Sequence, residues 1–250
     1  MLSVRQLSLR VPDRSLVEHL DFELKQGMCC ALLGRNGSGK SSLLLALAGL
    51  RTAQNGKLLL NGAALPAARE RAQKIGLLLQ DEQESFWGSV LDYVALGGLP
   101  AAGAFAGIGK ETRAHAQRAL AEMDLTAHAQ QSYRSLSGGE RQRARIAQLL
   151  VQDPQIFLLD EPLTHLDLGH QVLAMARFAA LSKAGRAVLM SLHEPQWAAK
   201  YCSDALLLYD AGRFLHGPVK ELMTVQNLEA LYGCRLETPV AGNRMLFVPA

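Results

Sequence analysis

Apolar residues recur between polar neighbours at the start of the chain, and short apolar runs follow further along. The alternation over residues 2–9 predicts a half-buried strand, and a turn at residues 12–15 leads to a second predicted strand at 20–24. Further strands are predicted at residues 58–60, 75–79, 156–159, 187–190, 206–209 and 213–216. The segment at 156–159 contains no polar residue, as is typical of a central strand in a parallel sheet.

Segments with helical character lie between these strands. They cover residues 42–48, 90–96, 110–123, 138–152, 168–183 and 228–232. Residues 86–135 are interpreted as a helical insertion, with the Ala- and Gly-rich residues 101–109 as its most mobile part. Strands that alternate with helices predict an α/β fold, and 250 residues suit one large domain or a core with a small subdomain.

A glycine-rich loop stands between the apolar residues 29–33 and the first predicted helix. It reads Gly34, Arg35, Asn36, Gly37, Ser38, Gly39, Lys40 and Ser41, and Ser42 follows. Strand, loop and helix in this order are the context of a phosphate-binding P-loop, in which backbone N–H groups and the helix N-terminus face the phosphates. Lys40 can reach the β- and γ-phosphates, and the Ser41 hydroxyl can bind Mg²⁺. A chance glycine turn is the weaker alternative, so the chain is predicted to bind a nucleoside triphosphate.

A second helix N-terminus carries a similar set of groups. Ser137 and Glu140 form a predicted capping box, and Gly138 and Gly139 lie between them. The free N–H groups of this turn could bind a second phosphate. Simple helix capping is the alternative interpretation, and both can hold together.

Two carboxylates follow the apolar strand at 156–159. Asp160 is placed to hold Mg²⁺ through water, opposite Ser41, and Glu161 can take a proton from an attacking water molecule. Two further polar residues follow predicted strands. Gln80 is neutral and suits sensing of the γ-phosphate or bridging to the metal, and His193 could donate a hydrogen bond to the γ-phosphate. A surface-turn carboxylate is the weaker alternative for Glu161, whereas His193 taken alone would be interpreted as a structural histidine.

These motifs together resemble those of ATP-binding-cassette (ABC) ATPases. The P-loop is followed in order by Gln80 (Q-loop), the signature segment 136–142, the Walker B strand 156–161, Asp167 in the D-loop and the switch residue His193. The resemblance implies an ATPase that uses ATP and Mg²⁺ and is coupled to transmembrane transport. It also implies a homodimer in which Ser137, Gly138 and Gly139 of one copy close over the P-loop of the other, head to tail, with Asp167 near the shared seam.

The implied fold is a P-loop NTPase (RecA-like) core with an N-terminal antiparallel β subdomain and a helical signature-motif subdomain. Residues 1–85 and 154–220 would form the core with its β subdomain, residues 86–153 the helical subdomain, and 221–250 a tail without assigned function. One departure concerns the adenine base, which the family stacks on an aromatic residue. Val11 stands there instead, so stacking is expected to be weaker or to come from Arg10 or Arg14, with poor discrimination among purines.

Looser matches point to the ATPases of metal-chelate importers. Residues 97–100 and the switch segment 191–199 are similar to segments of that group. The resemblance implies uptake of a ferric siderophore, haem or cobalamin through permease subunits, with a periplasmic or surface binding protein, and a peripheral location on the cytoplasmic face of the inner membrane. An exporter or another importer is the nearer alternative. A nucleic-acid ATPase is less favoured, because residues 80–136 contain no heptad run and the chain has one motif set.

Composition adds limits to this interpretation. The formal charge of +3 gives no reason to expect nucleic-acid binding, and the longest apolar runs are too short to span a membrane. The four cysteines form no C-x-x-C pair, which favours a reducing compartment. Phe86 and Trp87 lie just after the Q-loop, so they could anchor a permease helix in a groove beside residues 81–100. The alternative is that both aromatic rings simply pack the insertion onto the core.

Overall fold

The computed structural model describes residues 1–12, 14–80, 86–102 and 108–237, together with 240–241, 244–245 and 247–249. These residues form two compact units. The first unit contains Met1–Leu65 and Ala179–Ala250, and the second contains Pro66–Phe178. Among the described residues, no helix combines the length and the apolar character that a membrane span requires.

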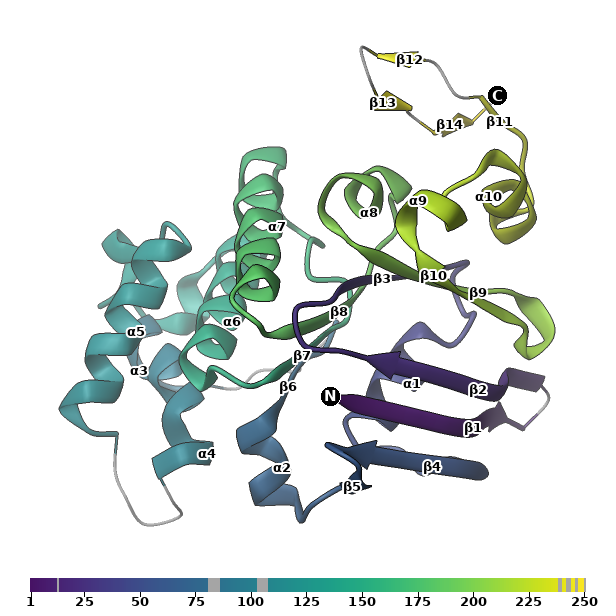
Figure 1. The fold of residues 1–250 in the computed structure, drawn as a ribbon. Helices are drawn as coiled ribbons and strands as arrows, with labels where there is room; N and C mark the ends of the chain where they lie inside the picture. Colours follow the sequence, from purple (N-terminus) through teal and green to yellow (C-terminus); the bar gives the residue numbers. More distant parts are fainter. Residues whose placement is uncertain are drawn as a thin grey trace. The chain divides into compact units, whose positions relative to one another are not determined.

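An antiparallel sheet begins the first unit, as predicted (Figure 1). Its strands are β1 (Leu2–Val11), β2 (Arg14–Leu24), β4 (Asn55–Leu60) and β5 (Ala63–Ala64), in the order β2-β1-β4-β5. Strand β2 begins six residues before its predicted start, at 14 rather than 20. The reason is pairing with β1 through three register shifts, which continues the ladder where the apolar alternation is irregular. Strand β4 likewise begins before the strand predicted at 58–60, because Asn55 already pairs with Ser8 of β1.

A second set of strands in the first unit surrounds β3 (Cys29–Gly34). β8 (Ala187–Ser191) and β9 (Asp204–Leu208) pair with β3 in parallel on either side. β10 (Phe214–Pro218) returns antiparallel to β9 after the turn η4 (Asp210–Gly212). Every residue of β3 and β8 is buried, as their continuous apolar sequence predicts.

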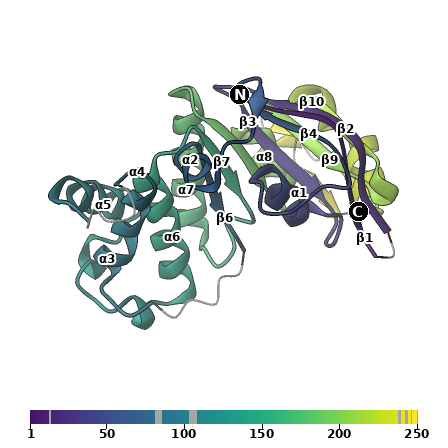
Figure 2. The ribbon, with the colours of Figure 1, turned by 90° about the horizontal axis from the view of Figure 1, so that it is seen from below.

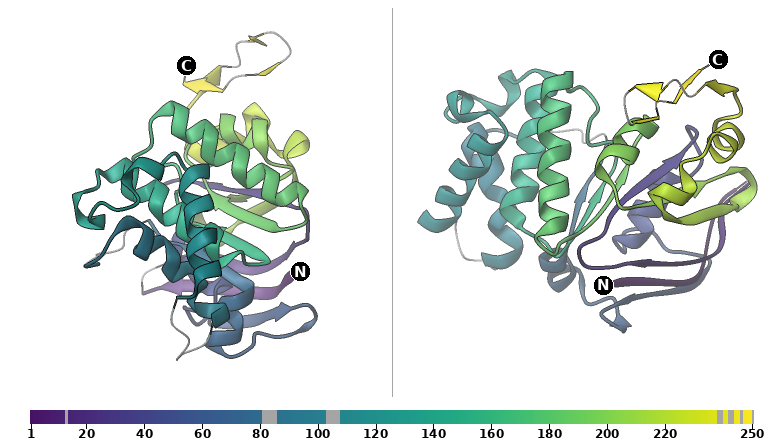
Figure 3. Two further views of the ribbon diagram at one scale, coloured as in Figure 1. Left: turned by 90° about the vertical axis from the view of Figure 1, so that its left-hand side faces the viewer. Right: turned by 45° about the horizontal axis from the view of Figure 1, so that its top comes forward.

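The helices of the first unit are short. They are α1 (Lys40–Leu47), α8 (Pro195–Tyr201), α9 (Val219–Leu222) and α10 (Val225–Tyr232). Helix α10 begins three residues before its predicted start, where Thr224 caps it. Two strand pairs follow α10, namely β11 (Leu236–Glu237) with β14 (Val248–Pro249) and β12 (Val240–Ala241) with β13 (Arg244–Met245) (Figure 3).

The second unit combines two parallel strands with helices. β6 (Ile75–Leu78) pairs with β7 (Ile156–Leu159). The helices are α2 (Ala68–Lys74), α3 (Val90–Ala95), α4 (Leu99–Ala102), α5 (Lys110–Glu122) and α6 (Gly138–Gln152), with single turns at η1 (Leu96–Gly98), η2 (Thr126–His128) and η3 (Tyr133–Ser135). Helix α7 (Leu168–Lys183) begins in the second unit and has the bounds predicted for it. Helix α2 was not predicted, because it buries no residue and so has no apolar period.

Residues 86–135 form the predicted helical insertion, whose helices α3 and α5 pack against each other and against α6 (Figure 2). The rings of Tyr93 and Tyr133 stack with centroids 4.0 Å apart, and Phe86 packs edge-on against both. Part of the predicted mobile loop is helical, since residues 101–102 end α4. Residues 103–107 lie outside the described residues.

Candidate active site

The glycine loop connects β3 to α1 and depends on its glycines. Gly37 and Gly39 have φ angles of 78° and 104°, in the left-handed region that favours glycine. A Cβ atom at Gly34 would lie 2.6 Å from Ser38 Oγ and 2.7 Å from the Leu208 carbonyl oxygen. The Ser38 N–H donates to the Arg35 carbonyl at 3.0 Å and closes the turn. The loop therefore has the tight curvature that phosphate-binding loops use.

Lys40 places a cation inside this loop. Its residue exposure is only 5%, and its Nζ donates to the Gly34 carbonyl at 2.8 Å and to the Arg35 carbonyl at 3.2 Å. A buried ammonium beside a helix N-terminus attracts an anion strongly, because little solvent screens it. The loop therefore suits phosphate. Ser41 is exposed, and the partly buried Ser42 accepts a hydrogen bond from Arg51 at 2.8 Å.

The residues expected near the base lie at the end of the β1–β2 hairpin. Val11 pairs with Arg14 across the hairpin. The Arg14 guanidinium donates to the Gly37 carbonyl, and Arg10 lies 3.9 Å from the Glu18 carboxylate. Arg14 thus supports the glycine loop directly. Which residue stacks on the base stays a prediction.

The second unit brings Gln80 and Glu161 together, although they are 81 positions apart along the chain. Gln80 Nε2 donates to Glu161 Oε2 at 2.7 Å, and the Thr164 hydroxyl approaches the same oxygen at 3.3 Å. Both residues follow the paired strands β6 and β7, whose carboxyl ends lie side by side. Glu161 has a φ of 48°, which is rare for a residue with a side chain and common at functional sites.

Asp160 stands directly after β7 and is 2% exposed. Its backbone N–H donates to the Leu78 carbonyl at 2.8 Å, which extends the pairing of β6 with β7 by one residue. A buried carboxylate at this edge could serve a hard cation. Among the described residues, no group of three or more His, Cys, Asp or Glu side chains could hold a metal. Mg²⁺ commonly binds through only one or two carboxylates and takes phosphate oxygens as further ligands, so the residues fit that ion.

Sequence reasoning missed two residues of α6 that support Gln80 and Glu161. Arg145 is 8% exposed and donates to the carbonyls of Leu79 and, at 3.2 Å, Gln80. Gln142 donates to the Pro162 carbonyl at 3.0 Å, and its own Oε1 accepts from Arg145 at 3.1 Å. The signal for Arg145 was its place one turn before Leu149, on the apolar face of α6.

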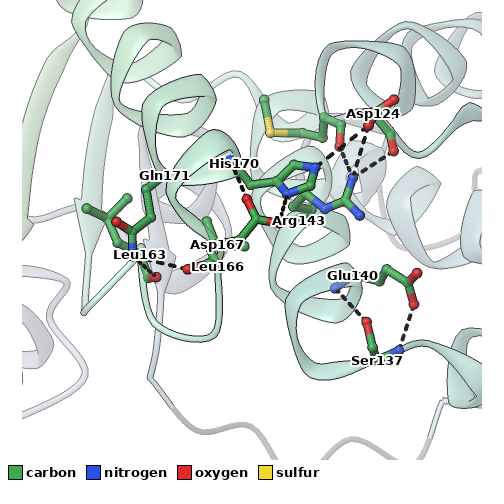
Figure 4. A network of polar contacts seen from close by, with 10 residues as sticks. Asp124, Ser137, Glu140, Arg143, Leu163, Leu166, Asp167, His170 and Gln171 are labelled. Atoms are coloured by element: carbon green, nitrogen blue, oxygen red, sulfur yellow. Dashed lines mark hydrogen bonds and ion pairs between the residues drawn. The ribbon is translucent and has the colours of Figure 1, made fainter.

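The predicted capping box at the start of α6 is confirmed. Ser137 N donates to Glu140 Oε2 at 2.7 Å, and Glu140 N donates to Ser137 Oγ at 3.3 Å (Figure 4). The hydrogen bond from the Ser137 backbone lowers the pKa of Glu140. A Cβ atom at Gly139 would lie 2.8 Å from the His165 carbonyl oxygen, so this close approach requires glycine.

His193 is exposed and follows β8 in the first unit. Its backbone carbonyl accepts a hydrogen bond from the Tyr232 hydroxyl at 3.4 Å, and burial raises the pKa of Tyr232 to about 12. The end of α10 also lies near the glycine loop, because a Cβ at Gly233 would stand 3.6 Å from an Arg35 guanidinium nitrogen. The tail, to which no function was assigned from sequence, therefore contacts residues of two predicted motifs.

The two aromatic residues after the Q-loop differ in their surroundings. Phe86 packs against Tyr93 and Tyr133, whereas Trp87 is 79% exposed and has the Arg134 guanidinium 4.1 Å from its ring centroid. Phe86 therefore packs within the helical insertion, on α3 and η3, rather than standing free for a partner. Residues 81–85 of the predicted groove lie outside the described residues.

Comparison with known proteins agrees with the motifs. The family model described as "ABC transporter" matches residues 17–164, more than half of the chain. The chain belongs to the ABC transporter family. The predicted cassette ATPase and its fold, a P-loop core with an N-terminal antiparallel sheet and a helical part, are confirmed.

Several curated members of the ABC transporter family are similar over nearly the full chain. The ferric enterobactin transport ATP-binding protein FepC of Escherichia coli is 35% identical, covering 96% of this chain and 91% of its own length. The hemin import ATP-binding protein HmuV of Pseudomonas aeruginosa is 36% identical, with 93% and 92% covered. The iron(3+)-hydroxamate import ATP-binding protein FhuC of Bacillus subtilis is 32% identical, with 92% and 87% covered.

Solved ABC structures share this fold. An inward-facing transporter described as of the metal-chelate type has a TM-score of 0.86 and 29% identity, with 100% of this chain and 97% of that chain covered. A dimeric bacterial ABC transporter cassette has a TM-score of 0.77 and 23% identity, with 88% and 99% covered. At that identity, the second comparison supports the fold alone.

Proposed function

We propose that this ABC subunit hydrolyses ATP to power the import of a metal chelate, namely a ferric siderophore, haem or cobalamin, through a membrane permease. The observation that carries the proposal is the similarity, at 32–36% identity and over at least 92% of the chain, to import subunits named for ferric enterobactin, hemin and iron(3+)-hydroxamate. The similarity to a metal-chelate-type transporter structure supports the same class of solute.

The proposed roles of the residues follow the motifs. The triphosphate binds to Gly34, Arg35, Asn36, Gly37, Ser38, Gly39, Lys40, Ser41 and Ser42. The buried Lys40 ammonium and the left-handed glycines support this role, because they concentrate positive charge and N–H donors in one loop. Ser137, Gly138 and Gly139 contact the nucleotide bound by a second copy, with the capping box fixing their turn. His193 contacts the γ-phosphate.

Glu161 acts as the general base in this proposal. The donors from Gln80 and Thr164 meet on one of its oxygens and orient the carboxylate before a water molecule gives up its proton. Because Gln80 donates to the base directly, a change in the position of Gln80 moves the Glu161 carboxylate relative to the reacting water. Gln80 therefore connects hydrolysis to the segment that follows it.

Ser41, Asp160 and Gln80 are proposed to hold Mg²⁺, since they offer hydroxyl, carboxylate and amide oxygens. When bound, Mg²⁺ neutralises charge on the β- and γ-phosphates. Asp160 supplies the buried negative charge that such an ion needs, and its backbone pairing with Leu78 keeps that carboxylate at the strand end.

The proposed partners are a second copy of the chain and the permease. Two copies bind head to tail around two ATP molecules, and the pair attaches to the permease at the cytoplasmic face of the inner membrane. A periplasmic or surface binding protein delivers the chelate to the permease. The exposed Trp87, with Arg134 against its ring, supports a permease contact near residues 86–87.

The proposal is tested by measuring solute uptake in cells in which this subunit carries a single substitution. Lys40→Ala removes the buried cation, and a lost charged donor in a closed site costs about 10²–10³-fold in turnover. Glu161→Gln removes the base, which costs about 10²–10⁴-fold. We expect both variants to lose uptake of one of three labelled solutes, namely a ferric siderophore, haem or cobalamin, while hydrolysis by the purified variants falls in parallel.

Lys57→Ala is the matched control, because Lys57 is exposed on β4 of the same unit as Lys40. It should support uptake and hydrolysis at the wild-type rate. Normal uptake of all three solutes by cells with Lys40→Ala would refute the transport proposal. Normal ATP turnover in purified Lys40→Ala would refute the role given to the loop.

A further inference from the structure

The D-loop residue Asp167 is held by a histidine three residues later. His170 N donates to Asp167 Oδ1 at 2.9 Å, and His170 Nδ1 lies 2.9 Å from Asp167 Oδ2. The backbone hydrogen bond from His170 and the contact with its ring lower the pKa of Asp167. Both oxygens of this exposed carboxylate therefore face one residue at the start of α7.

The other ring nitrogen of His170 faces a second carboxylate. His170 Nε2 lies 3.7 Å from Asp124 Oδ2, and Asp124 follows α5 (Figure 4). Arg143 of the signature helix α6 donates to the Asp124 carbonyl at 2.7 Å and to the Met123 carbonyl at 2.9 Å, and its guanidinium stands 3.9 Å from Asp124 Oδ2. His170 thus links Asp167 to a buried arginine of α6.

Two further contacts tie the D-loop to its surroundings in the second unit. Gln171 Nε2 donates to the Leu166 carbonyl at 3.1 Å and approaches the Leu163 carbonyl at 3.5 Å (Figure 4). The His165 carbonyl lies against Gly139 of the signature segment. His165 has a φ of 67°, an uncommon conformation that neighbouring contacts must hold.

We propose that His170 is a positioning residue that fixes the Asp167 carboxylate and couples the D-loop to the signature helix through Asp124 and Arg143. The inference rests on the proposed function, because Asp167 and Ser137 are the residues expected to face the second copy. The His170 contacts connect the D-loop, which contains Asp167, to the helix that begins at the signature segment. The two segments therefore face the second copy as one surface. The carboxylates of Asp167 and Asp124 face the two ring nitrogens, and Arg143 lies on the far side of this contact as an ion-pair partner of Asp124.

A purely structural role would give a different result. An exposed ion pair contributes about 0–1 kcal/mol to stability. His170→Ala removes both ring contacts but keeps the backbone N–H that donates to Asp167, so the N-terminus of α7 remains capped. A positioning role predicts a larger effect on dimer assembly and turnover than on unfolding.

The test uses the full chain. In a Glu161→Gln background, we expect His170→Ala to weaken ATP-driven dimer formation by about tenfold, the low end for a hydrogen bond between charged groups. In the wild-type background, kcat should fall by about the same factor. The affinity of the monomer for a fluorescent ATP analogue should stay within about twofold of wild type, since the His170 ring makes no contact with the glycine loop in the hydrogen bonds and ion pairs described above.

His170→Asn separates the two ring contacts, because its amide nitrogen can replace Nδ1 and cannot replace Nε2. It should restore Asp167 and leave Asp124 without its partner, so its kcat should lie between those of wild type and His170→Ala. The matched control is Arg177→Gln, which breaks the 2.8 Å ion pair between Arg177 of α7 and Glu122 of α5 without touching the D-loop. This control should form dimers as Glu161→Gln does.

Amide hydrogen exchange keeps this test independent of the dimer. In the monomer, His170→Ala should speed exchange over residues 163–171 and 137–142, and Arg177→Gln should not. If Glu161→Gln alone stays monomeric with ATP, the proposed dimer is wrong, and the exchange result still decides the role of His170. Unchanged exchange together with unchanged kcat in His170→Ala would overturn the inference while leaving the proposed function intact.

Discussion

Replacement of Arg145 by Met tests how α6 supports the residues proposed for hydrolysis. The Arg145 guanidinium is buried and donates to the carbonyls of Leu79 and Gln80 and to Gln142 Oε1. Methionine fills a similar volume and offers no donor, so these oxygen atoms lose the hydrogen bonds that it supplied. The change therefore isolates the polar contribution of one side chain.

The expected loss of stability follows from these contacts. A hydrogen bond to a charged group contributes about 1.5–3 kcal/mol, and bonds made by one group do not add fully. We expect Arg145→Met to lower the free energy of unfolding by about 3–5 kcal/mol, because three neutral oxygen atoms lose a charged donor and their contributions do not add fully. A chain of this length would then melt roughly 10 °C lower. Because Gln80 loses its anchor, kcat should fall as well.

Urea and thermal unfolding followed by circular dichroism measure the first effect, and steady-state hydrolysis measures the second. The control is Arg141→Met, one turn before Arg145 on α6. It removes an exposed hydrogen bond of 2.9 Å from Arg141 to the Arg134 carbonyl. It should cost less than about 1 kcal/mol. If Arg145→Met unfolds within about 1 kcal/mol of wild type, the buried hydrogen bonds do not stabilise this region as argued.

Two further predictions follow from the second unit. Trp87→Ala should abolish permease-stimulated hydrolysis and leave the unfolding midpoint unchanged, whereas Phe86→Ala should lower that midpoint, because only Phe86 packs on other rings; stimulation that survives Trp87→Ala would exclude this contact. The side-chain hydrogen bond from Ser89 lowers the pKa of Asp92, as the Ser137 backbone does for Glu140, so both carboxylates stabilise the fold above their unfolded pKa. This contribution is lost as pH falls through the folded pKa. The melting temperature should therefore depend less steeply on pH, between about pH 5 and pH 2, in Asp92→Asn and Glu140→Gln than in wild type; an unchanged dependence in both variants would contradict the argument.

The sequence by itself determined the features that depend on neighbouring residues. The strand–loop–helix around Lys40, the capping box of Ser137 and Glu140, and the bounds of α7 all follow from local spacing, because turns, caps and helix periods involve residues within a few positions. The order of the motifs predicted the cassette family as well. It could not fix the full length of β2, whose first residues are held by pairing with β1.

Only the tertiary structure decided which distant side chains meet. Gln80 and Glu161 come together because β6 and β7 are neighbours, and Arg145 reaches Gln80 because α6 packs beside β6. His170 faces Asp124 because α7 begins beside the end of α5. These contacts join residues 46 to 81 positions apart, and no local pattern records such a separation. Trp87 and Phe86 are adjacent in sequence, yet packing against Tyr93 and Tyr133 partly covers the Phe86 ring and leaves Trp87 exposed.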